Sequence, residues 1–363
     1  MNEYISICLI VSRVMEGRVL SIQSHVAFGY VGGKAAAFPL QCLGYDLVNT
    51  VNFSNHAGYG RSGGSKMSAE ELDSIFEAME VNELLSPSRL LTGYIPNAQA
   101  LTAVARLVGK LRKRQPDLIY LLDPVMGDAG RLYVAADVVP VYRSLLPLST
   151  IITPNWFEVE TLTDIPLTDL QSLRRALHKL HRDFGVPNIA ISSIPLTPWL
   201  FESLPSDIKP HADSETEHLL CITSSLSSNK TSPSKVHAQC VPLLPGYFSG
   251  VGDLFSSLVL AHYNPHIDSS SVLLPSRTSF SEAVSQALTK THAVLCKTFE
   301  YSEQLPEEER LVTDDEKDVA EPIRKIRRMR GRELKLVQSI DIIRGDCGDA
   351  MRRLESWSEF WKQ

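Results

Sequence analysis

Short apolar segments of strand length alternate with segments of helical periodicity along most of this chain. The strand-like segments are rich in aliphatic residues and cover residues 18–23, 46–53, 90–92, 118–122, 150–153 and 188–193. Between them, apolar residues recur three and four positions apart, as in amphipathic helices, at 32–43, 68–80, 98–112, 156–162 and 167–184. Strands that alternate with helices favour parallel pairing, because each helix carries the chain back along the sheet. The pattern predicts an α/β fold with three layers, in which helices cover both faces of a mostly parallel central sheet.

Polar side chains lie at or just beyond the ends of these predicted strands. They are Ser24, Tyr94, Asp123, Thr153, Asn155 and Ser193. In open α/β sheets, ligands bind outside the carboxyl ends of the strands. We therefore expect these six side chains to share one edge of the sheet and to form a ligand site there.

A glycine-rich turn with an acidic residue precedes the predicted helix that starts near Leu254. Gly250 and Gly252 flank Val251, and Asp253 follows directly. Glycines allow backbone N–H groups to approach an anion closely, and a helix N-terminus adds partial positive charge. A carboxylate beside a phosphate cradle is best explained if it handles a proton. The turn therefore suggests a general base for phosphoryl transfer to an alcohol.

A second acidic group follows two neighbouring predicted strands. Asp123 and Asp128 lie within one strand-to-turn segment, and Asn155 and Glu158 lie at the start of the next helix. These are hard oxygen ligands of the kind that Mg²⁺ uses, often through water. Equally, Asp123 could cap its turn, and Asn155 could cap a helix with Glu158 in its first turn. The two interpretations are compatible for a helix that starts in a cleft.

Composition excludes several classes of protein. The net charge of −6 argues against a nucleic-acid partner, because phosphate backbones bind basic surfaces. The six cysteines are scattered without a C-x-x-C pair, which favours reduced intracellular thiols. The apolar run at 5–11 is too short to span a membrane and lacks the basic flank of a signal peptide. We expect a cytosolic protein without a membrane partner, with the nucleus as an alternative location.

Four segments depart from the α/β pattern, which we assign to one domain over 18–345. Residues 1–17 precede the first predicted strand and are expected to form an extension. Residues 203–235 are rich in Ser, Thr, Pro, Asp and Glu and predict a disordered insertion. Residues 303–330 change from acidic to basic and predict a solvated charged linker. Residues 346–363 predict a closing amphipathic C-terminal helix.

Taken in order, the motifs of this chain resemble those of pyridoxal kinases, a branch of the ribokinase-like superfamily. The matching segments cover residues 18–26, 29–32, 38–41, 53–56, 91–94, 123–128, 151–158, 250–255 and 333–339. The resemblance spans roughly residues 18–300 and 332–344 in family order and spacing, which is far more specific than any single motif. It implies a ribokinase-like three-layer fold.

The resemblance also implies an activity. Such a kinase uses ATP to phosphorylate the 5′-hydroxymethyl group of pyridoxal, pyridoxine and pyridoxamine, as in vitamin B6 salvage. The family uses Mg²⁺, with another divalent metal such as Zn²⁺ as an alternative, often with K⁺, and it usually forms a homodimer. Two rivals stay open: a hydroxymethylpyrimidine kinase of the same fold, and an inactive relative that only binds pyridoxal phosphate or a partner.

Carried over position by position, the resemblance implies roles for individual residues. Asp253 would be the base, and Gly250 and Gly252 would form the anion hole. The substrate pocket would comprise Ser24, Val31, Val51, Phe53, Ala57 and Tyr94, together with Gly250 and Asp253. ATP would contact Asp123, Asn155, Ser192, Ser193, Leu244 and Val251. The metal would be held near Asp128, Thr153 and Glu158.

Three positions depart from the commoner family pattern. Ala57, Val251 and Ser192 each stand where many relatives have threonine. The first change removes a hydroxyl from the pyridine pocket, and the second removes a side-chain contact to phosphate while backbone N–H donors remain. None of the three alters the base or the acidic group, so we expect activity with altered nucleotide affinity.

Overall fold

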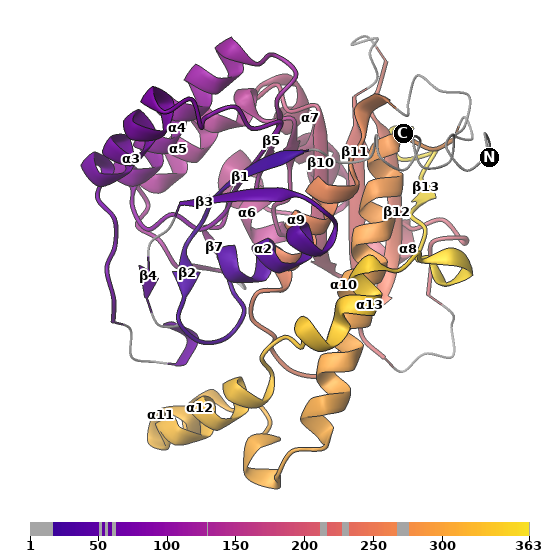
Figure 1. Ribbon diagram of the computed structural model, residues 1–363. Helices are drawn as coiled ribbons and strands as arrows, with labels where there is room; N and C mark the ends of the chain where they lie inside the picture. The colour runs from indigo at the N-terminus through magenta and orange to yellow at the C-terminus, as the bar shows by residue number, and fades with distance from the viewer. Residues whose placement is uncertain are drawn as a thin grey trace, which may run out of the picture.

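The computed structural model of the chain describes residues 17–50, 53–54, 57–59, 63–128, 130–210, 216–226, 232–266 and 276–362. Within these residues a nine-stranded sheet has the order β13-β12-β11-β10-β9-β6-β5-β1-β3 (Figure 1). Its strands are β1 (Arg18–Ile22), β3 (Asp46–Thr50), β5 (Arg89–Thr92), β6 (Ile119–Leu122), β9 (Ile151–Ile152), β10 (Asn188–Pro195), β11 (His218–Ser225), β12 (Lys235–Pro242) and β13 (Glu355–Ser356). Neighbouring strands are parallel from β3 to β10, and the last three pairings are antiparallel. The predicted fold class is confirmed.

Helices cover both faces of the sheet (Figure 1). One face packs on α3 (Ala69–Val81), α4 (Ala98–Arg114), α5 (Val138–Leu145), α6 (Trp156–Thr163) and α7 (Leu170–Arg182). The other packs on α2 (Gly33–Cys42), α9 (Val251–His262), α10 (Ser279–Glu303) and α13 (Ile340–Arg344). Alternate residues of one strand reach opposite cores: Leu122 lies in the first and Leu121 in the second. Burial on both faces explains why the parallel strands are almost continuously apolar.

Two small sheets extend the carboxyl edge of the large one. β2 (His25–Val26) pairs in parallel with β4 (Phe53–Ser54), just beyond β1 and β3. β7 (Gly127–Asp128) pairs with β8 (Arg131–Leu132) in antiparallel fashion, beyond β6. They place residues that follow β1, β3 and β6 around one rim.

The prediction of a disordered insertion over 203–235 is wrong for its described residues. β11 lies between β10 and β12, and most of its side chains are buried. Its Ser and Thr residues suggested a loop, but Thr223 and Ser224 are hydrogen-bonded in the core. Ser224 Oγ, for example, donates to Ser234 Oγ at 2.7 Å and contacts His181 Nε2 at 2.7 Å. Satisfied hydroxyls cost little to bury, so this polar strand is stable inside the sheet. Residues 211–215 and 227–231 lie outside the described residues.

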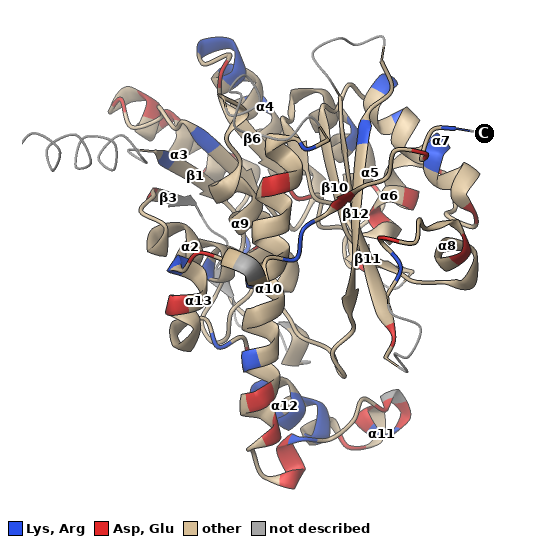
Figure 2. Cartoon of the chain, turned by 90° about the vertical axis from the view of Figure 1, so that its right-hand side faces the viewer, with Lys and Arg blue, Asp and Glu red and all other residues tan. Residues whose placement is uncertain are grey.

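The segment predicted as a charged linker over 303–330 instead contains helices. η4 (Glu307–Glu309) is followed by α11 (Asp315–Ala320) and α12 (Pro322–Gly331), which protrude from the sheet layers in Figure 1. Figure 2 shows acidic residues on α11 and basic residues on α12. Arg328 donates to Asp318 through Nη1 at 3.0 Å, and both side chains are buried. Asp318 and Arg328 therefore pair with one another away from solvent and tie α11 to α12.

The C-terminal helix predicted over 346–363 is also wrong. Residues 346–362 contain a short 3₁₀ turn, η6 (Gly348–Ala350), and the edge strand β13, with no α-helix. Trp357 and Phe360 form an edge-to-face pair with centroids 5.0 Å apart, and Trp361 Nε1 donates to the Ser234 carbonyl at 2.9 Å. Their apolar spacing therefore reflects docking beside β12. Of the predicted extension, only Gly17 is described.

Among the described residues, every helix is either too short or too polar to cross a lipid bilayer.

Candidate active site

The start of α9 can be built only with glycine at its N-cap. Gly250 has a φ of 80°, and a Cβ atom there would overlap the carbonyl oxygen of Tyr30. L-residues rarely adopt this left-handed conformation. By contrast, a Cβ on Gly252 would meet no protein atom within 4 Å. Packing therefore requires glycine at 250, whereas at 252 the backbone faces open space that a ligand could occupy.

The loop at 28–32, which precedes α2, lies against this helix start. Gly32, the N-cap of α2, has a φ of 56°, and a Cβ there would overlap the Ser24 carbonyl oxygen. Gly33 N–H donates to that oxygen at 2.7 Å. Gly32 N–H donates to Asp253 Oδ2 at 2.7 Å. The end of β1 and the N-termini of α2 and α9 therefore meet at the Asp253 carboxylate.

The Asp253 carboxyl group has a perturbed pKa. Burial raises its pKa to about 6, and hydrogen bonds from backbone N–H groups, led by that of Gly32, partly oppose this shift. At neutral pH the group is mostly ionised, yet it is far more basic than an ordinary aspartate. Such tuning is typical of catalytic carboxylates that accept a proton near neutral pH.

Asp123 belongs to a buried hydroxyl network beneath the same helix. Its Oδ2 accepts a hydrogen bond from Ser256 Oγ at 2.9 Å, and Ser256 Oγ lies 2.9 Å from Thr153 Oγ1. Burial raises the Asp123 pKa well above its ordinary value, and the negative charges of Glu158 and Asp253 raise it further. The network joins α9 to the carboxyl ends of β6 and β9.

Sequence reasoning missed Ser256, although a signal was present. Ser256 is three residues after Asp253, so both side chains lie on one face of α9. The apolar residues around it made the segment look like a purely core helix. Only the position of Asp123 opposite this face reveals the role of the hydroxyl.

Asn155 and Glu158 form a capping box at the start of α6. Asn155 Oδ1 accepts from Glu158 N–H at 2.9 Å, and Glu158 Oε2 accepts from Asn155 N–H at 2.9 Å. The pair also reaches the neighbouring turn: Glu158 Oε1 accepts from Met126 N–H at 2.9 Å, and Asn155 Nδ2 donates to the Gly127 carbonyl at 2.8 Å. The helix-cap interpretation is confirmed, and the pair holds the turn that leads to Asp128.

The pKa of Glu158 is raised to about 8 by burial, which outweighs the backbone N–H groups that favour its ionised form. Asp123, Glu158 and Asp253 are thus three acidic groups whose charges are poorly solvated at one edge of the sheet. A cluster of such carboxylates favours a bound cation, because the positive charge stabilises the ionised form of each of them.

The predicted substrate residues follow β1 and β5. Ser24 Oγ donates to the Tyr94 carbonyl at 3.5 Å, and Val31 directly precedes Gly32 in the 28–32 loop. Phe53 lies in β4, and its backbone pairs with His25. Ala57 begins η1 (Ala57–Tyr59). Val51 lies outside the described residues. Their roles in substrate binding stay predictions.

The residues predicted to contact ATP lie farther along the same rim. Ser192 and Ser193 lie at an irregularity of β10, where the register shifts between Ile191 and Ile194. β12 runs in the same direction as β10, because two antiparallel pairings separate them. Leu244 follows the end of β12 and so lies at the same edge as Ser193. Val251 is the first residue of α9.

Two tyrosines near Asp128 were not singled out from the sequence. Burial raises the pKa of both Tyr133 and Tyr247, and the negative charge of Asp128 contributes at each. The two side chains hydrogen-bond to one another, although each is about half exposed, at 54% and 51%. They join the β7–β8 hairpin to the loop before α9, and no sequence motif marks them.

Proteins with a similar sequence or fold are described as kinases of pyridoxal or of a phosphomethylpyrimidine. A family model described as phosphomethylpyrimidine kinase matches residues 36–197. The pyridoxal kinase of Arabidopsis thaliana is 38% identical over 255 residues, covering 69% of this chain and 76% of the relative. The human pyridoxal kinase is 36% identical over 261 residues, covering 69% and 78%. The pyridoxal kinase of Leishmania donovani, solved in complex with ADP and pyridoxamine, matches with a TM-score of 0.73 at 30% identity, covering 94% of this chain and 99% of that chain.

The parallel sheet, with a glycine-capped helix and a buried acidic group at its carboxyl edge, defines a ribokinase-like α/β protein. Within that class, the chain belongs to the pyridoxal kinase family.

Proposed function

We propose that this chain transfers the γ-phosphoryl group of ATP to the 5′-hydroxymethyl group of pyridoxal, and also of pyridoxine and pyridoxamine. The observation that carries the proposal is the Asp253 carboxylate, which lies between the N-termini of α2 and α9 directly after the glycine pair. A proton acceptor and an anion site are thereby adjacent, as transfer to an alcohol requires. The product, a pyridoxal 5′-phosphate type cofactor, fits a role in vitamin B6 salvage.

The reaction needs little covalent work from the protein. As the substrate oxygen bonds to the γ-phosphorus and the bond to the ADP oxygen breaks, the hydroxyl proton passes to Asp253. Backbone N–H groups at 250–252 stabilise charge on the transferring group. In this account, Ser24 and Tyr94 orient the vitamin ring, and most of the rate comes from positioning and electrostatics.

The acidic rim fits a divalent cation held jointly with ATP. Among the described residues, no three His, Cys, Asp or Glu side chains are grouped as a metal site of their own. Mg²⁺ commonly binds through one or two carboxylates, water and substrate phosphates, so such a group is not needed. Asp128 and Thr153 would hold it, with Glu158 acting mainly on the turn before Asp128. When bound, Mg²⁺ neutralises charge on the phosphates. K⁺ and Zn²⁺ stay alternatives from the resemblance.

A magnesium titration tests the role of Glu158. We expect Glu158→Gln to raise the Mg²⁺ concentration for half-maximal activity several-fold more than it raises the KM for pyridoxal. The substitution replaces one of the two carboxyl oxygens that accept backbone N–H groups near Asp128, and it leaves the ring pocket unchanged.

Glu160→Gln is the matched control for this experiment. Glu160 lies on the same helix but accepts a hydrogen bond from Leu167 N–H, away from the site. If the titration curves of the parent, Glu158→Gln and Glu160→Gln overlay, Glu158 is a helix-start residue without influence on the metal.

The choice of substrate has one rival with an observation in its favour, because the matching family model is described as phosphomethylpyrimidine kinase. A coupled ADP-release assay with ATP compares pyridoxal with hydroxymethylpyrimidine. We expect kcat/KM to favour pyridoxal by at least about tenfold, since the family resemblance assigns Ser24 and Tyr94 to a pocket for a pyridine ring. A preference for the pyrimidine would support the rival, and turnover of neither would support a relative that only binds.

The homodimeric state and cytosolic location implied by the family resemblance belong to this proposal. Light scattering after size exclusion measures the oligomeric state, with twice the chain mass of 40.3 kDa as the expected result.

Nucleotide affinity, measured by calorimetry in the parent and in Val251→Thr, tests whether the missing threonine hydroxyl weakens ATP binding.

A further inference from the structure

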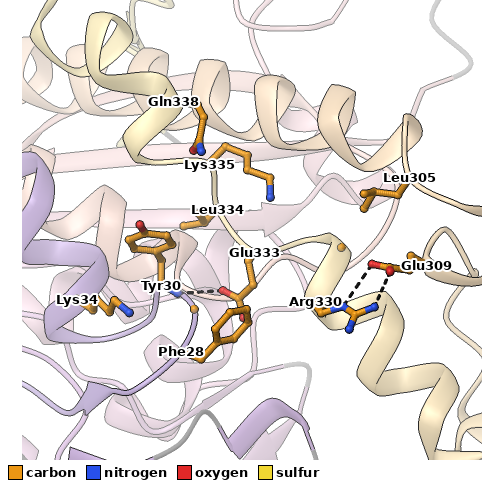
Figure 3. Close-up of a pocket in the computed structure, with 12 residues that line it drawn as sticks. Phe28, Tyr30, Lys34, Leu305, Glu309, Arg330, Glu333, Leu334, Lys335 and Gln338 are labelled. Carbon is orange, nitrogen blue, oxygen red and sulfur yellow. Dashed lines mark hydrogen bonds and ion pairs between the residues drawn. The ribbon is translucent and has the colours of Figure 1, made fainter.

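Glu333 follows α12 and bridges segments that are distant in sequence. Its Oε2 accepts from Tyr30 N–H at 2.9 Å, and its Oε1 accepts from the Tyr59 hydroxyl at 2.8 Å. Figure 3 shows Glu333 between the loop that carries Phe28 and Tyr30 and the end of α12. The side chain is buried, although it is a carboxylate with no substrate or phosphate role in the reaction described above.

The chain approaches this carboxylate unusually closely. Gly29 has a φ of 83°, and a Cβ there would overlap the Glu333 carboxyl group. A side chain at 29 would therefore displace Glu333 or the loop. The loop and the carboxylate are fitted to each other.

Apolar packing alone does not hold this loop. Phe28 is 57% exposed, and a cavity of about 420 Å³ lies between the loop and α12 (Figure 3). Nearby cations have contacts of their own: Arg330 pairs with Glu309, and Lys34 lies over the Tyr30 ring at 5.4 Å from its centroid. The polar contacts of Glu333 therefore join the loop and η1 to the segment after α12 beside this open pocket.

On its other side, the same loop touches the anion site. The Tyr30 carbonyl oxygen lies against Gly250, and Gly32 N–H donates to Asp253. Glu333 therefore contacts the loop at Tyr30, two residues before Gly32, which contacts Asp253. Through Tyr59 it also holds η1, the 3₁₀ turn that begins at Ala57.

We propose that Glu333 is a positioning residue that holds the 28–32 loop against the start of α9 and holds η1 beside it. Through the loop it orients the Gly32 N–H toward Asp253, and through Tyr59 it places the turn that bears the predicted substrate residue Ala57. This inference rests on the proposed function of Asp253. It assigns a role in the reaction to the segment that follows the α11–α12 helices, far from the site in sequence.

Three variants test the proposal by steady-state kinetics. Glu333→Ala removes both acceptors, and we expect kcat/KM for pyridoxal to fall by about tenfold or more, with kcat also reduced. Glu333→Gln should stay within about threefold, because its oxygen can accept from Tyr30 N–H while its amide donates to the Tyr59 oxygen. Tyr59→Phe releases only η1 and should raise the KM several-fold with little change in kcat.

Glu309→Ala is the matched control, because Glu309 lines the same cavity but pairs with Arg330. It should leave kcat and KM within about twofold of the parent, since the Glu309 side chain pairs with Arg330 and not with Tyr30 or Tyr59. If Glu333→Ala has the kinetics of Glu309→Ala, the inference is overturned, whatever the melting temperatures. Should Glu333→Ala fail to fold, an unchanged KM in Tyr59→Phe would overturn it instead.

A double variant separates positioning from general destabilisation. In Glu333→Ala, Tyr59 has already lost its acceptor, so adding Tyr59→Phe should change the KM no further. Independent, additive effects would contradict the shared contact. A separate experiment tests the proposed function: if Asp253→Asn keeps its turnover, Asp253 is not the base. The KM comparisons above test only the contacts of Glu333 with Tyr30 and Tyr59.

Discussion

Replacing Asp253 by asparagine is expected to lower turnover by about 10²–10⁴, which corresponds to roughly 3–5 kcal/mol of activation barrier. The amide is nearly isosteric with the carboxylate but cannot accept the hydroxyl proton. The dissociation constants for pyridoxal and ATP should change far less, because the glycine turn and the ring pocket remain. Steady-state kinetics beside direct binding of both ligands measures the difference.

The same carboxylate predicts a pH dependence with a definite sign. Its pKa of about 6 means that the base is ionised above that pH and protonated below it. In the parent, kcat/KM should therefore fall as the pH drops through about 6, and this limb should vanish in Asp253→Asn.

Asp341→Asn provides the control for Asp253→Asn, because Asp341 occupies the first turn of another helix, α13, and is exposed. It should leave turnover and the pH profile unchanged. A turnover in Asp253→Asn within about threefold of the parent, less than about 1 kcal/mol of barrier, would remove Asp253 from the catalytic role.

Gly250→Ala is expected to damage both stability and activity. Alanine pays roughly 1–2 kcal/mol for the left-handed conformation. Its Cβ would also overlap the Tyr30 carbonyl and push the 28–32 loop outward. Because a displacement near 1 Å at a catalytic site can cost about 10² in rate, we expect a loss of that order together with a lower melting temperature.

Gly252→Ala tests the other half of the glycine pair. Its Cβ would meet no protein atom within 4 Å, and alanine favours a helix over glycine by about 1 kcal/mol, so the melting temperature should be kept or raised. A loss of activity without a loss of stability would place the phosphate beside Gly252.

For the preceding variant, Gly250→Ala, parent-like stability and turnover would contradict the predicted overlap with the Tyr30 carbonyl oxygen.

Much of the site follows from local sequence patterns. Strand-length apolar runs determined where the central strands lie, and the polar residues after them, such as Asp123 and Asn155, lie at the predicted edge. The turn around Gly250 forms the start of a helix, as its glycines and the following apolar run indicate. These features depend on periodicity and on backbone geometry within a few residues, which a single segment of sequence carries.

The tertiary structure decided what those patterns left open. Hydroxyl-rich β11 is a buried strand because partners such as His181 satisfy Ser224, and the charged α11 and α12 are ordered because Asp318 meets Arg328. Glu158 accepts a hydrogen bond from the Met126 backbone N–H, in a turn 32 residues away. Glu333 meets Tyr30 across 303 residues. A polar side chain stabilises a fold or a site only through the partner that faces it, and for these residues folding supplies that partner from a distant part of the chain.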